Sequence, residues 1–468
     1  MPEPSFSSLV EQARRVADGE TTSRALVDHA LARIAALDVE LNAFAHVRDQ
    51  AREEAEALDA ELAAGRPRGA LHGVPVAIKE ENDVAGLVTG FGGRGNSTPA
   101  SADGEVVRRL RAAGAVVVGT TRMPEFGIWP FTESDAHGIT RNPWDLSRSP
   151  AGSSGGTGAA VAAGIVAMGI GGDGGGSIRL PASWCGVFGL KPQRGRVSSA
   201  PARDLWRALG TRGPLTRTVA DSALVYDVIS GAADADRYRA APLPESLLAA
   251  SAREPGRLRV LLSLANPMRD AEPDADTAAA VRATGELLAS LGHEVTEADP
   301  RYPDLRIAFQ VQLGGGVRDE AAAVEHRDRL EPRTRTVLRI ARALAPLGGW
   351  AERSSARAGD EFLARVFGAY DVLLMPTTPT AAQPAGRLLA ASGLEAAELA
   401  RPVASFTSIW NVFGNPAASV PAGFDAAGLP LAVQLVGPAD SEPLLVSLSA
   451  QLEAARPWAD RRPALAAD

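Results

Sequence analysis

The sequence predicts an α/β fold: one large domain with a mixed central β-sheet that helices cover on both faces. Two observations lead to this prediction. Helical patterns and short apolar runs typical of strands alternate along most of the chain. No low-complexity linker divides the 468 residues, and a composition of 45% hydrophobic and 22% charged residues is ordinary for a folded domain.

The amino-terminal half of the chain predicts helices separated by short strands. Thr22 or Ser23 can cap a helix over 22–36, in which apolar residues recur at helical spacing. A charge-rich helix is expected over 47–64 and a helix of small residues over 158–168. The other elements predicted here are strands at 74–78 and 116–118 and helices at 104–113 and 218–230.

The carboxy-terminal half continues the same alternation. The region 235–275 is rich in Pro, Ala, Asp and Arg, which indicates a surface connection, and the stretch 315–365 is charged and helical. The predicted strands lie at 260–262, 293–296, 372–374 and 431–436, and the predicted helices at 274–291 and 443–454.

Composition argues against several classes of partner. A net charge of −8 without a basic block argues against nucleic-acid binding. The start of the chain lacks the features of a signal peptide, and no run is apolar enough to span a membrane. A single cysteine, Cys185, excludes an intrachain disulfide, and six scattered histidines argue against a metal site. We therefore expect a cytoplasmic enzyme that uses no metal or cofactor.

Only two of the 48 basic residues are lysines, Lys79 and Lys191, and the others are arginines. A buried ammonium group can lose its proton and act as a base, whereas a guanidinium group keeps its charge. The two lysines are therefore candidates for a task that arginine cannot perform, with chance survival as the alternative.

Two clusters of glycine and serine, 149–156 and 172–179, flank the predicted helix of small residues. Glycine lets a ligand approach the main chain, and successive N–H groups in such a loop can converge on an anion. These clusters therefore predict either a phosphate cradle or an oxyanion hole.

Two known motifs match this region literally but lack their structural context. Gly169, Gly171 and Gly174 satisfy the dinucleotide-binding pattern G-x-G-x-x-G, yet no strand is predicted before them and no helix after them. Residues 152–156 satisfy the nucleophile-elbow pattern G-x-S-x-G, yet no apolar strand leads into them and no histidine follows residue 326. What remains is a serine nucleophile that a lysine activates.

The run from Ser149 to Pro192, with Ser153 and Ser177 on either side of the helix and Lys79 upstream, resembles the amidase signature family. The resemblance covers about residues 70–230 and resumes at 370–376, 406–408, 414–421 and 429–437. It implies the amidase signature fold, with a single amidase domain over 1–468. The implied parts are an N-terminal helical segment (1–65), a signature core (70–230), a variable substrate-side region (235–365) and a C-terminal part of the core (370–460).

The resemblance also implies an amidase that cleaves a carboxylic amide C–N bond through an acyl-enzyme. The implied roles are Ser177 as nucleophile, Ser153 as proton relay after a cis peptide bond from Gly152, and Lys79 as base. Backbone N–H groups would form the oxyanion hole, and three further residues match supporting positions around it. The implied hole comprises Gly174, Gly175, Gly176 and Ser177, and the supporting residues are Ser154, Asp173 and Arg179.

The substrate is expected to be a small-molecule amide. Gly127, Ile128 and Trp129 occupy the position that lines the acyl site in relatives, and they favour an uncharged aromatic amide. Further candidates for the pocket are Trp206, Trp410 and Phe413. The alternative function is that of the A-type subunit of a tRNA-dependent amidotransferase, which releases ammonia from glutamine. The presence of all three catalytic groups argues against an inactive scaffold, and the resemblance makes a homodimer plausible.

The sequence departs from the family pattern at three places. Ala151 stands where glycine is usual, and Glu80-Glu81 follow the base where Asp-Asn is frequent. Gly172 and Gly174 stand where threonine or isoleucine is typical, so we expect a looser oxyanion loop. None of these departures removes a catalytic group.

Overall fold

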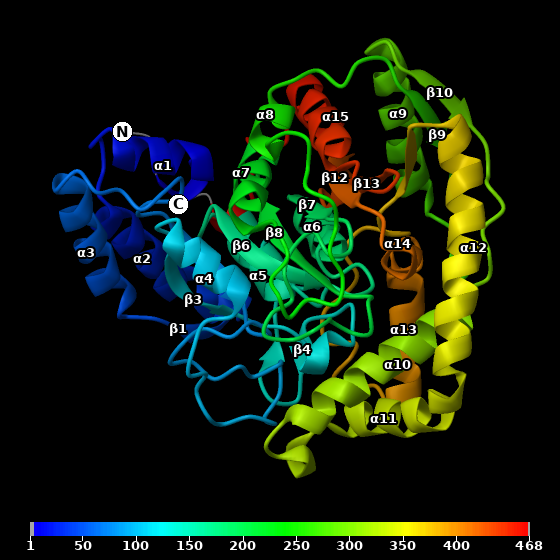
Figure 1. Ribbon diagram of the computed structural model, residues 1–468, viewed down its shortest axis with the longest axis horizontal. Coiled ribbons are helices and arrows are strands. Elements are labelled where there is room, and N and C mark those ends of the chain that lie inside the picture. Colours follow the sequence, from blue (N-terminus) through cyan, green and yellow to red (C-terminus); the bar gives the residue numbers. More distant parts are fainter. Residues whose placement is uncertain (1–3, 467–468) are drawn as a thin grey trace.

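A mixed β-sheet of 11 strands runs through the protein (Figure 1). The computed structural model describes residues 4–466. In spatial order the strands of the sheet are β1 (Phe44–Val47), β3 (Val116–Thr121), β2 (Pro75–Lys79), β6 (Met168–Asp173), β8 (Thr211–Thr216), β7 (Phe188–Lys191), β12 (Ala417–Phe424), β13 (Pro430–Val436), β11 (Val372–Pro376), β9 (Arg259–Leu262) and β10 (Glu294–Glu297). A separate hairpin joins β4 (Glu133–Ser134) to β5 (Gly138–Ile139).

The strand directions bring two distant chain segments to one edge of the sheet. β2 is parallel to β3 and to β6, so the carboxyl ends of β2 and β6 lie at the same edge. β2 ends at Lys79 and β6 ends at Asp173. β6 also pairs antiparallel with β8, which places Arg212 directly opposite Gly172. The loops that follow β2 and β6 therefore meet beside the start of β8.

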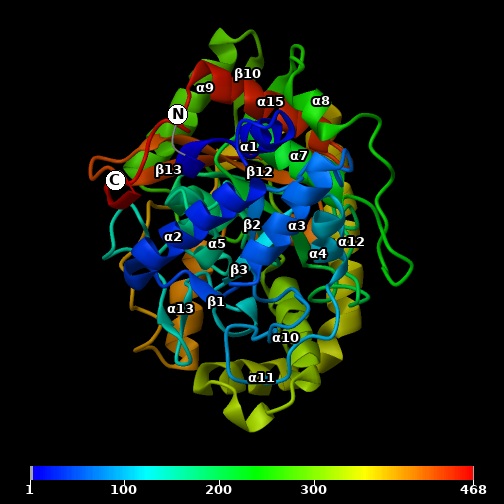
Figure 2. The same ribbon diagram turned by 90° about the vertical axis from the view of Figure 1, so that its left-hand side faces the viewer.

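Helices cover both faces of the sheet, because its strands carry apolar side chains on both (Figures 1 and 2). In β9, Val260 and Leu262 join one core and Leu261 joins the other, as the alternation of a strand requires. The first core contains side chains of α1 (Leu9–Ala17), α4 (Glu105–Ala112), α7 (Val219–Ile229), α8 (Leu247–Ser251), α9 (Ala275–Ser290) and α15 (Glu442–Ala455). The opposite face packs against α2 (Ser23–Leu41), α3 (Ala51–Ala63), α5 (Gly155–Ala162) and α6 (Arg179–Cys185), and towards its other end against α10 (Arg306–Ala323), α12 (Gly348–Ala369) and α14 (Ser408–Phe413).

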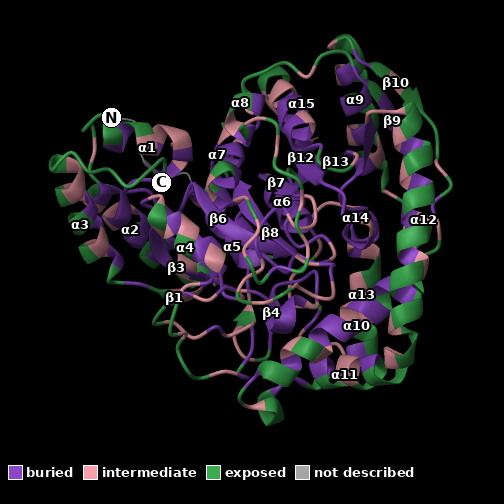
Figure 3. Ribbon diagram, viewed as in Figure 1, coloured by how far each residue is buried: buried purple, intermediate pink, exposed green. Residues whose placement is uncertain are grey.

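The long helices α10 and α12 form a helical group at one end of the molecule with α11 (Pro332–Leu344) and α13 (Gly393–Val403), and α12 has an exposed outer side (Figure 3). No helix within residues 4–466 is long and apolar enough to cross a membrane. The short 3-10 helices are η1 (Pro4–Phe6), η2 (Glu125–Gly127), η3 (Arg327–Arg329), η4 (Ala345–Leu347) and η5 (Ala464–Ala466).

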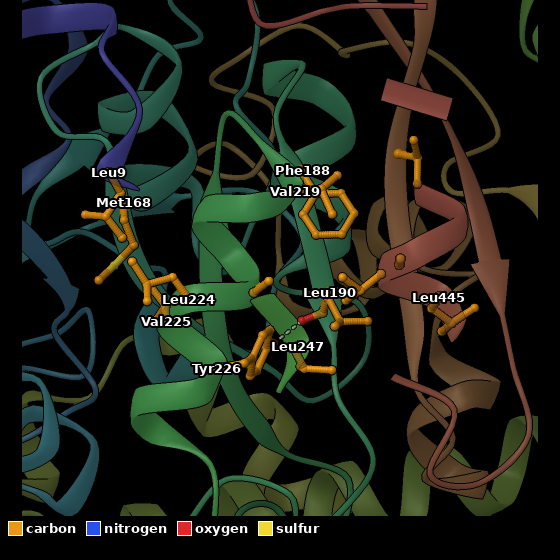
Figure 4. Close-up of a cluster of buried hydrophobic side chains, with 14 of the residues drawn as sticks. Leu9, Met168, Phe188, Leu190, Val219, Leu224, Val225, Tyr226, Leu247 and Leu445 are labelled. Carbon is orange, nitrogen blue, oxygen red and sulfur yellow. Dashed lines mark hydrogen bonds between the residues drawn. The ribbon is translucent and has the colours of Figure 1, made fainter. Parts of the chain in front are cut away.

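The packing between α7 and the sheet holds β6 and β7 in place (Figure 4). Leu224 and Val225 of α7 lie in one apolar cluster with Met168 of β6. Tyr226 reaches the strand backbone, where its hydroxyl donates to the Leu190 carbonyl oxygen. Burial raises the pKa of Tyr226 far above its usual value, so the phenol stays a neutral donor.

Most predicted elements are confirmed to within a few residues, with the end of one helix as the main correction. The Thr22 side chain caps α2 by accepting from the Ala25 N–H at 3.1 Å. The helix predicted over 158–168 is wrong at its end, because α5 stops at Ala162 and the chain enters β6 at Met168. Gly164, with φ of +66°, makes this turn, since a residue with a Cβ rarely adopts that conformation.

Candidate active site

Lys79 occupies the last position of β2, and it is 1% exposed. Its Nζ lies 2.8 Å from Ser153 Oγ and 3.0 Å from Glu81 Oε2. Within residues 4–466 these are the only polar contacts of the amine. The base predicted from the sequence is therefore held between a hydroxyl and a carboxylate, away from bulk water.

Ser153 and Ser154 lie in the turn that leads into α5, and the Gly152–Ser153 peptide bond is cis, as the family resemblance implied. Ser154 Oγ donates to the Gly172 carbonyl oxygen at 3.1 Å and lies 3.2 Å from the Gly172 nitrogen, whose N–H points to it. The Ser154 N–H donates to the Ser177 carbonyl oxygen at 3.3 Å. These bonds tie the serine turn to β6 and to the residue predicted as nucleophile.

Ser177 ends the glycine loop between β6 and α6, and it is 7% exposed. The loop folds around Asp173, whose Oδ1 accepts from the Gly176 N–H at 2.7 Å and whose Oδ2 accepts from the Ile178 N–H at 3.1 Å. Gly176 has a φ of +132°, a conformation that residues with a Cβ avoid.

The N–H groups of this loop divide into two sets. That of Gly176 is taken by Asp173. Those of Gly175 and Ser177 have no partner in the described part of the chain. Of the N–H groups predicted to form an oxyanion hole at residues 174–177, that of Gly176 is therefore already occupied, because it donates to the carboxylate that shapes the loop.

Asp173 is itself fixed by a buried ion pair. Arg179 Nη2 lies 2.9 Å from Asp173 Oδ1, and both side chains are 0% exposed. Burial alone would raise the pKa of Asp173, but the charge and hydrogen bonds of Arg179, with a further bond from Asn411, hold it well below its usual value. Arg179 also donates to Gln434 Oε1 at 2.7 Å, which connects the loop to β13. The two predicted supporting residues thus hold the loop from inside the core.

A cavity opens beside Lys79 and Ser153. Trp206, a predicted pocket candidate, lines it, together with three charged residues that the predicted site did not include. Glu81 comes from the turn after β2 and Arg212 from β8, while Trp206 precedes β8 and Glu320 lies on α10. The other lining residues are Phe91, Gly172, Asp173, Gly174, Leu205, Gly210 and Thr211.

The two unusual glycines of β6 and its loop make room for two of these side chains. A Cβ on Gly172 would lie 1.8 Å from Glu81 Oε1, and one on Gly174 would lie 2.3 Å from Trp206 Cε3. The loop was expected to be looser, but the indole of Trp206 fills the space that Gly174 leaves. Trp206 and Arg207 have φ values of +48° and +50°, so the backbone is strained where it presents this ring. In the sequence, these two glycines were the feature that could have indicated neighbours such as Glu81 and Trp206, because a glycine leaves room for a side chain from elsewhere in the chain.

Substituting Gly174→Ala should therefore lower both stability and activity. Overpacking of this kind costs about 1–3 kcal/mol, so we expect a lower midpoint of thermal unfolding and at least an approximately tenfold lower kcat/KM. In the double variant Gly174→Ala, Trp206→Ala, the unfolding midpoint should fall by less than the sum of the decreases in the two single variants. Gly368→Ala is the control, because a Cβ there meets no atom within 4 Å. Additive effects in the double variant would contradict the contact.

The residues predicted to line the acyl site lie in different surroundings. Gly127 adjoins the site, since a Cβ there would lie 2.9 Å from Ser153 Oγ. Trp129 is 3% exposed and packs in an apolar cluster with Phe131 and Trp184, and Ile128 packs against the same cluster. Of the other aromatic candidates, only Trp206 lines the cavity, whereas Trp410 and Phe413 belong to the core around α12.

The second lysine lies outside the cavity. Lys191 Nζ donates to the Pro192 carbonyl oxygen at 2.9 Å, and burial, with the nearby charge of Arg179, lowers its pKa well below the usual value. Cys185 is buried, and its burial raises the pKa of the thiol. Lys79 is thus the lysine that the fold places against a serine hydroxyl.

Comparison with known proteins places the chain among enzymes that act on amides. The family model described as Amidase matches residues 25–446. The protein named "Putative amidase AmiB2" of Mycobacterium tuberculosis is 44% identical over 464 residues, which cover 98% of each chain. A solved 6-aminohexanoate cyclic dimer hydrolase with bound substrate has a TM-score of 0.92 and 32% identity, with 99% of each chain covered. The peptide amidase of Stenotrophomonas maltophilia has a TM-score of 0.84 and 28% identity, with 98% of each chain covered.

Proposed function

This chain belongs to the amidase family, and we propose that it hydrolyses a carboxylic amide through an acyl-enzyme on Ser177, with Ser153 as proton relay and Lys79 as base. The observation that carries the proposal is the distance of 2.8 Å between Lys79 Nζ and Ser153 Oγ. Both groups line a cavity bordered by the glycine loop that ends at Ser177.

The first step transfers a proton from the nucleophile to the lysine. Ser153 Oγ passes its proton to the lone pair of Lys79 Nζ and takes the proton of Ser177 Oγ, which attacks the amide carbonyl carbon. The Glu81 carboxylate, 3.0 Å from Nζ, accepts a hydrogen bond from the amine and stabilises the ammonium group that forms. Glu81 thereby holds the lone pair towards Ser153.

The carbonyl oxygen gains negative charge as the C–O bond forms. The partnerless N–H groups of Gly175 and Ser177, together with that of Gly174, are the donors proposed for this oxyanion. One such donor is worth about 3 kcal/mol in the transition state of a hydrolase. Asp173 keeps the loop in shape through the bonds it accepts from Gly176 and Ile178.

The second half of the reaction returns the protons. Lys79 gives its proton back through Ser153 to the leaving nitrogen, the C–N bond breaks, and the amine departs. Water then attacks the ester carbonyl, with Lys79 again as the base and Ser153 again as the relay. This step releases the acid and restores Ser177. This sequence needs neither a histidine nor a cofactor.

The variable region 235–365 is proposed to shape the substrate end of the cavity, because α10 supplies Glu320 to its lining. The comparisons name an enzyme for a cyclic amide and one for peptide amides as relatives. A small or cyclic carboxylic amide is therefore the proposed substrate. A homodimer and a cytoplasmic location stay predictions.

A screen of amides tests the proposed function. The purified protein is incubated with anilides, primary amides, cyclic amides and glutamine, and released amine or ammonia is measured. Release from the first three groups by the protein alone supports the proposal, with Ser177→Ala as the matched control. Release from glutamine only when partner subunits are added would favour the amidotransferase alternative instead.

A further inference from the structure

Arg212 is buried, with 6% of its surface exposed, yet it has almost no hydrogen-bond partners among the described residues. Its one hydrogen bond to the described residues runs from Nη1 to the Ser198 carbonyl oxygen at 3.5 Å, which is a long bond for this pair of atoms. Its Nε is buried and has no hydrogen-bond partner among the residues that the structure describes. No carboxylate among residues 4–466 forms an ion pair with it, and no aromatic ring of that part of the chain lies under it.

Other buried arginines of the described chain find several close acceptors, either carboxylates or, for Arg217, the carbonyl oxygens of Val161, Val166 and Ser7. Arg179 forms an ion pair with Asp173, and Arg196 forms one with the buried Glu442 at 2.9 Å. A buried charge that lacks a partner is costly, by several kcal/mol in measured cases. A guanidinium group cannot reduce that cost by losing its proton at ordinary pH. The unpaired state of Arg212 therefore indicates a partner that comes from outside the chain.

The position of Arg212 shows where that partner binds. Residues directly opposite each other on neighbouring strands project from the same face, and Arg212 stands opposite Gly172. The Glu81 carboxylate lies over Gly172, and its other oxygen contacts Lys79. Arg212 therefore lines the same cavity as the proposed base, so a group bound to Arg212 lies in the cavity that Lys79 also lines.

The carboxyl groups inside the cavity do not pair with the guanidinium group of Arg212. The Glu81 carboxylate contacts Lys79, and it acts on Arg212 only through its charge. Burial raises the pKa of Glu320 to about 8, and the charge of Glu81 adds to the shift, which favours the neutral form of Glu320 at pH 7. Within residues 4–466, neither carboxyl group therefore forms an ion pair with Arg212.

Acidic residues outside the cavity do not replace a direct partner. Asp83 and Asp236 act on Arg212 only through their charges at a distance. Asp83 accepts a hydrogen bond from Thr89 at 2.6 Å, and Asp236 accepts from the Ser199 hydroxyl at 2.9 Å. Burial lowers the pKa of Arg212 despite them, which is the expected direction for a cation without enough compensation.

We propose that Arg212 binds a carboxylate of the substrate, so that the substrate is an amide that also carries a carboxylate group. Arg212 offers the planar fork of donors that matches a carboxylate. This inference rests on the proposed function, because it requires that the cavity beside Lys79 is the active site. It replaces the uncharged aromatic substrate that the aromatic residues of the sequence favoured.

The kinetic test compares matched substrates. The mono-4-nitroanilides of malonic, succinic and glutaric acid are compared with their methyl esters, which remove the charge. At the best chain length the wild type should prefer the free acid in kcat/KM by about 10- to 100-fold, as expected for hydrogen bonds to a charged group. Arg212→Gln should bring this ratio to about one, mainly through KM, and Arg212→Lys should keep part of it. Arg259→Gln, at the exposed first residue of β9, should leave the ratio unchanged.

A wild type that hydrolyses acid and ester equally well would overturn the proposal without any variant. A second measurement separates this inference from the proposed function. Calorimetric titration of Ser177→Ala with succinamate and with succinamide requires no turnover, and succinamate should bind at least about tenfold more tightly. If no anilide is hydrolysed but succinamate binds more tightly than succinamide, the proposed function is wrong and the carboxylate site is supported. Equal binding of the two compounds would overturn the site.

Discussion

The substitution Ser177→Ala should abolish amide hydrolysis and the covalent acyl adduct together. Serine hydrolases that lose the nucleophile lose on the order of 10⁶-fold in kcat, because the remaining groups have no attacking atom to act on. The wild type treated with a serine-directed fluorophosphonate should gain the mass of one adduct on the peptide that contains Ser177. The variant should gain none, as measured by mass spectrometry of the intact protein and of its peptides.

Ser154→Ala is the matched control for this experiment, since Ser154 bonds to the backbone of Gly172 and plays no part in the proposed proton transfer. It should still form the adduct, although more slowly. An adduct on Ser153 or on any other residue of the wild type would assign the nucleophile to that residue and contradict the mechanism. Equal unfolding midpoints for the wild type and Ser177→Ala would show that the loss is chemical.

Substituting Lys79→Ala should remove most of the activity at neutral pH, by about 10²- to 10⁴-fold in kcat, which is the usual contribution of a general base. The reason is geometric as well as chemical, because the amine contacts Ser153 and Glu81 and no other basic side chain within residues 4–466 bonds to Ser153 Oγ. Steady-state kinetics with the best amide from the screen provides the measurement.

Lys79→Arg sharpens the test of the base. Arginine keeps a positive charge near Glu81, but it cannot give up a proton at neutral pH, so this variant should be as inactive as Lys79→Ala. Activity of Lys79→Arg near that of the wild type would show that the site needs a cation and not a base. Circular dichroism of both variants should match the wild type, because otherwise misfolding would explain the loss.

The elements that could be predicted from the sequence are those whose residues carry a local signal. The cap at Thr22 and the apolar spacing after it are sufficient to locate α2. β6 could not be predicted, because glycines make up half of Met168–Asp173 and have low strand propensity. Its pairing with β2 and β8 decides its conformation, and that pairing is a tertiary property. The same holds for β8, which contains a glycine and a proline.

The residues of the candidate site also differ in whether the sequence alone could nominate them. Lys79, Ser153 and Ser177 could be nominated because they stand in a recognisable run of the sequence. Glu81, Arg212 and Glu320 could not, since no pattern along the chain links a turn after β2, a strand and a helix that lie far apart in sequence. Only the two unusual glycines pointed to neighbours, and they did not show which residues those were. The residues proposed here to choose the substrate are thus the ones that the fold alone brings together.

The strand order of the sheet also has a consequence for how late in synthesis the proposed active site can be completed. β7 borders β12, and β13 separates β12 from β11, so the middle of the sheet stays open until residues 417–436 have been made. Arg179, which holds the loop before α6, bonds to Gln434 of β13 and to Asn411 of α14. A nascent chain on the ribosome therefore carries Lys79, Ser153 and Ser177 long before it can hold them in place, and it completes the proposed active site only as its last strands emerge.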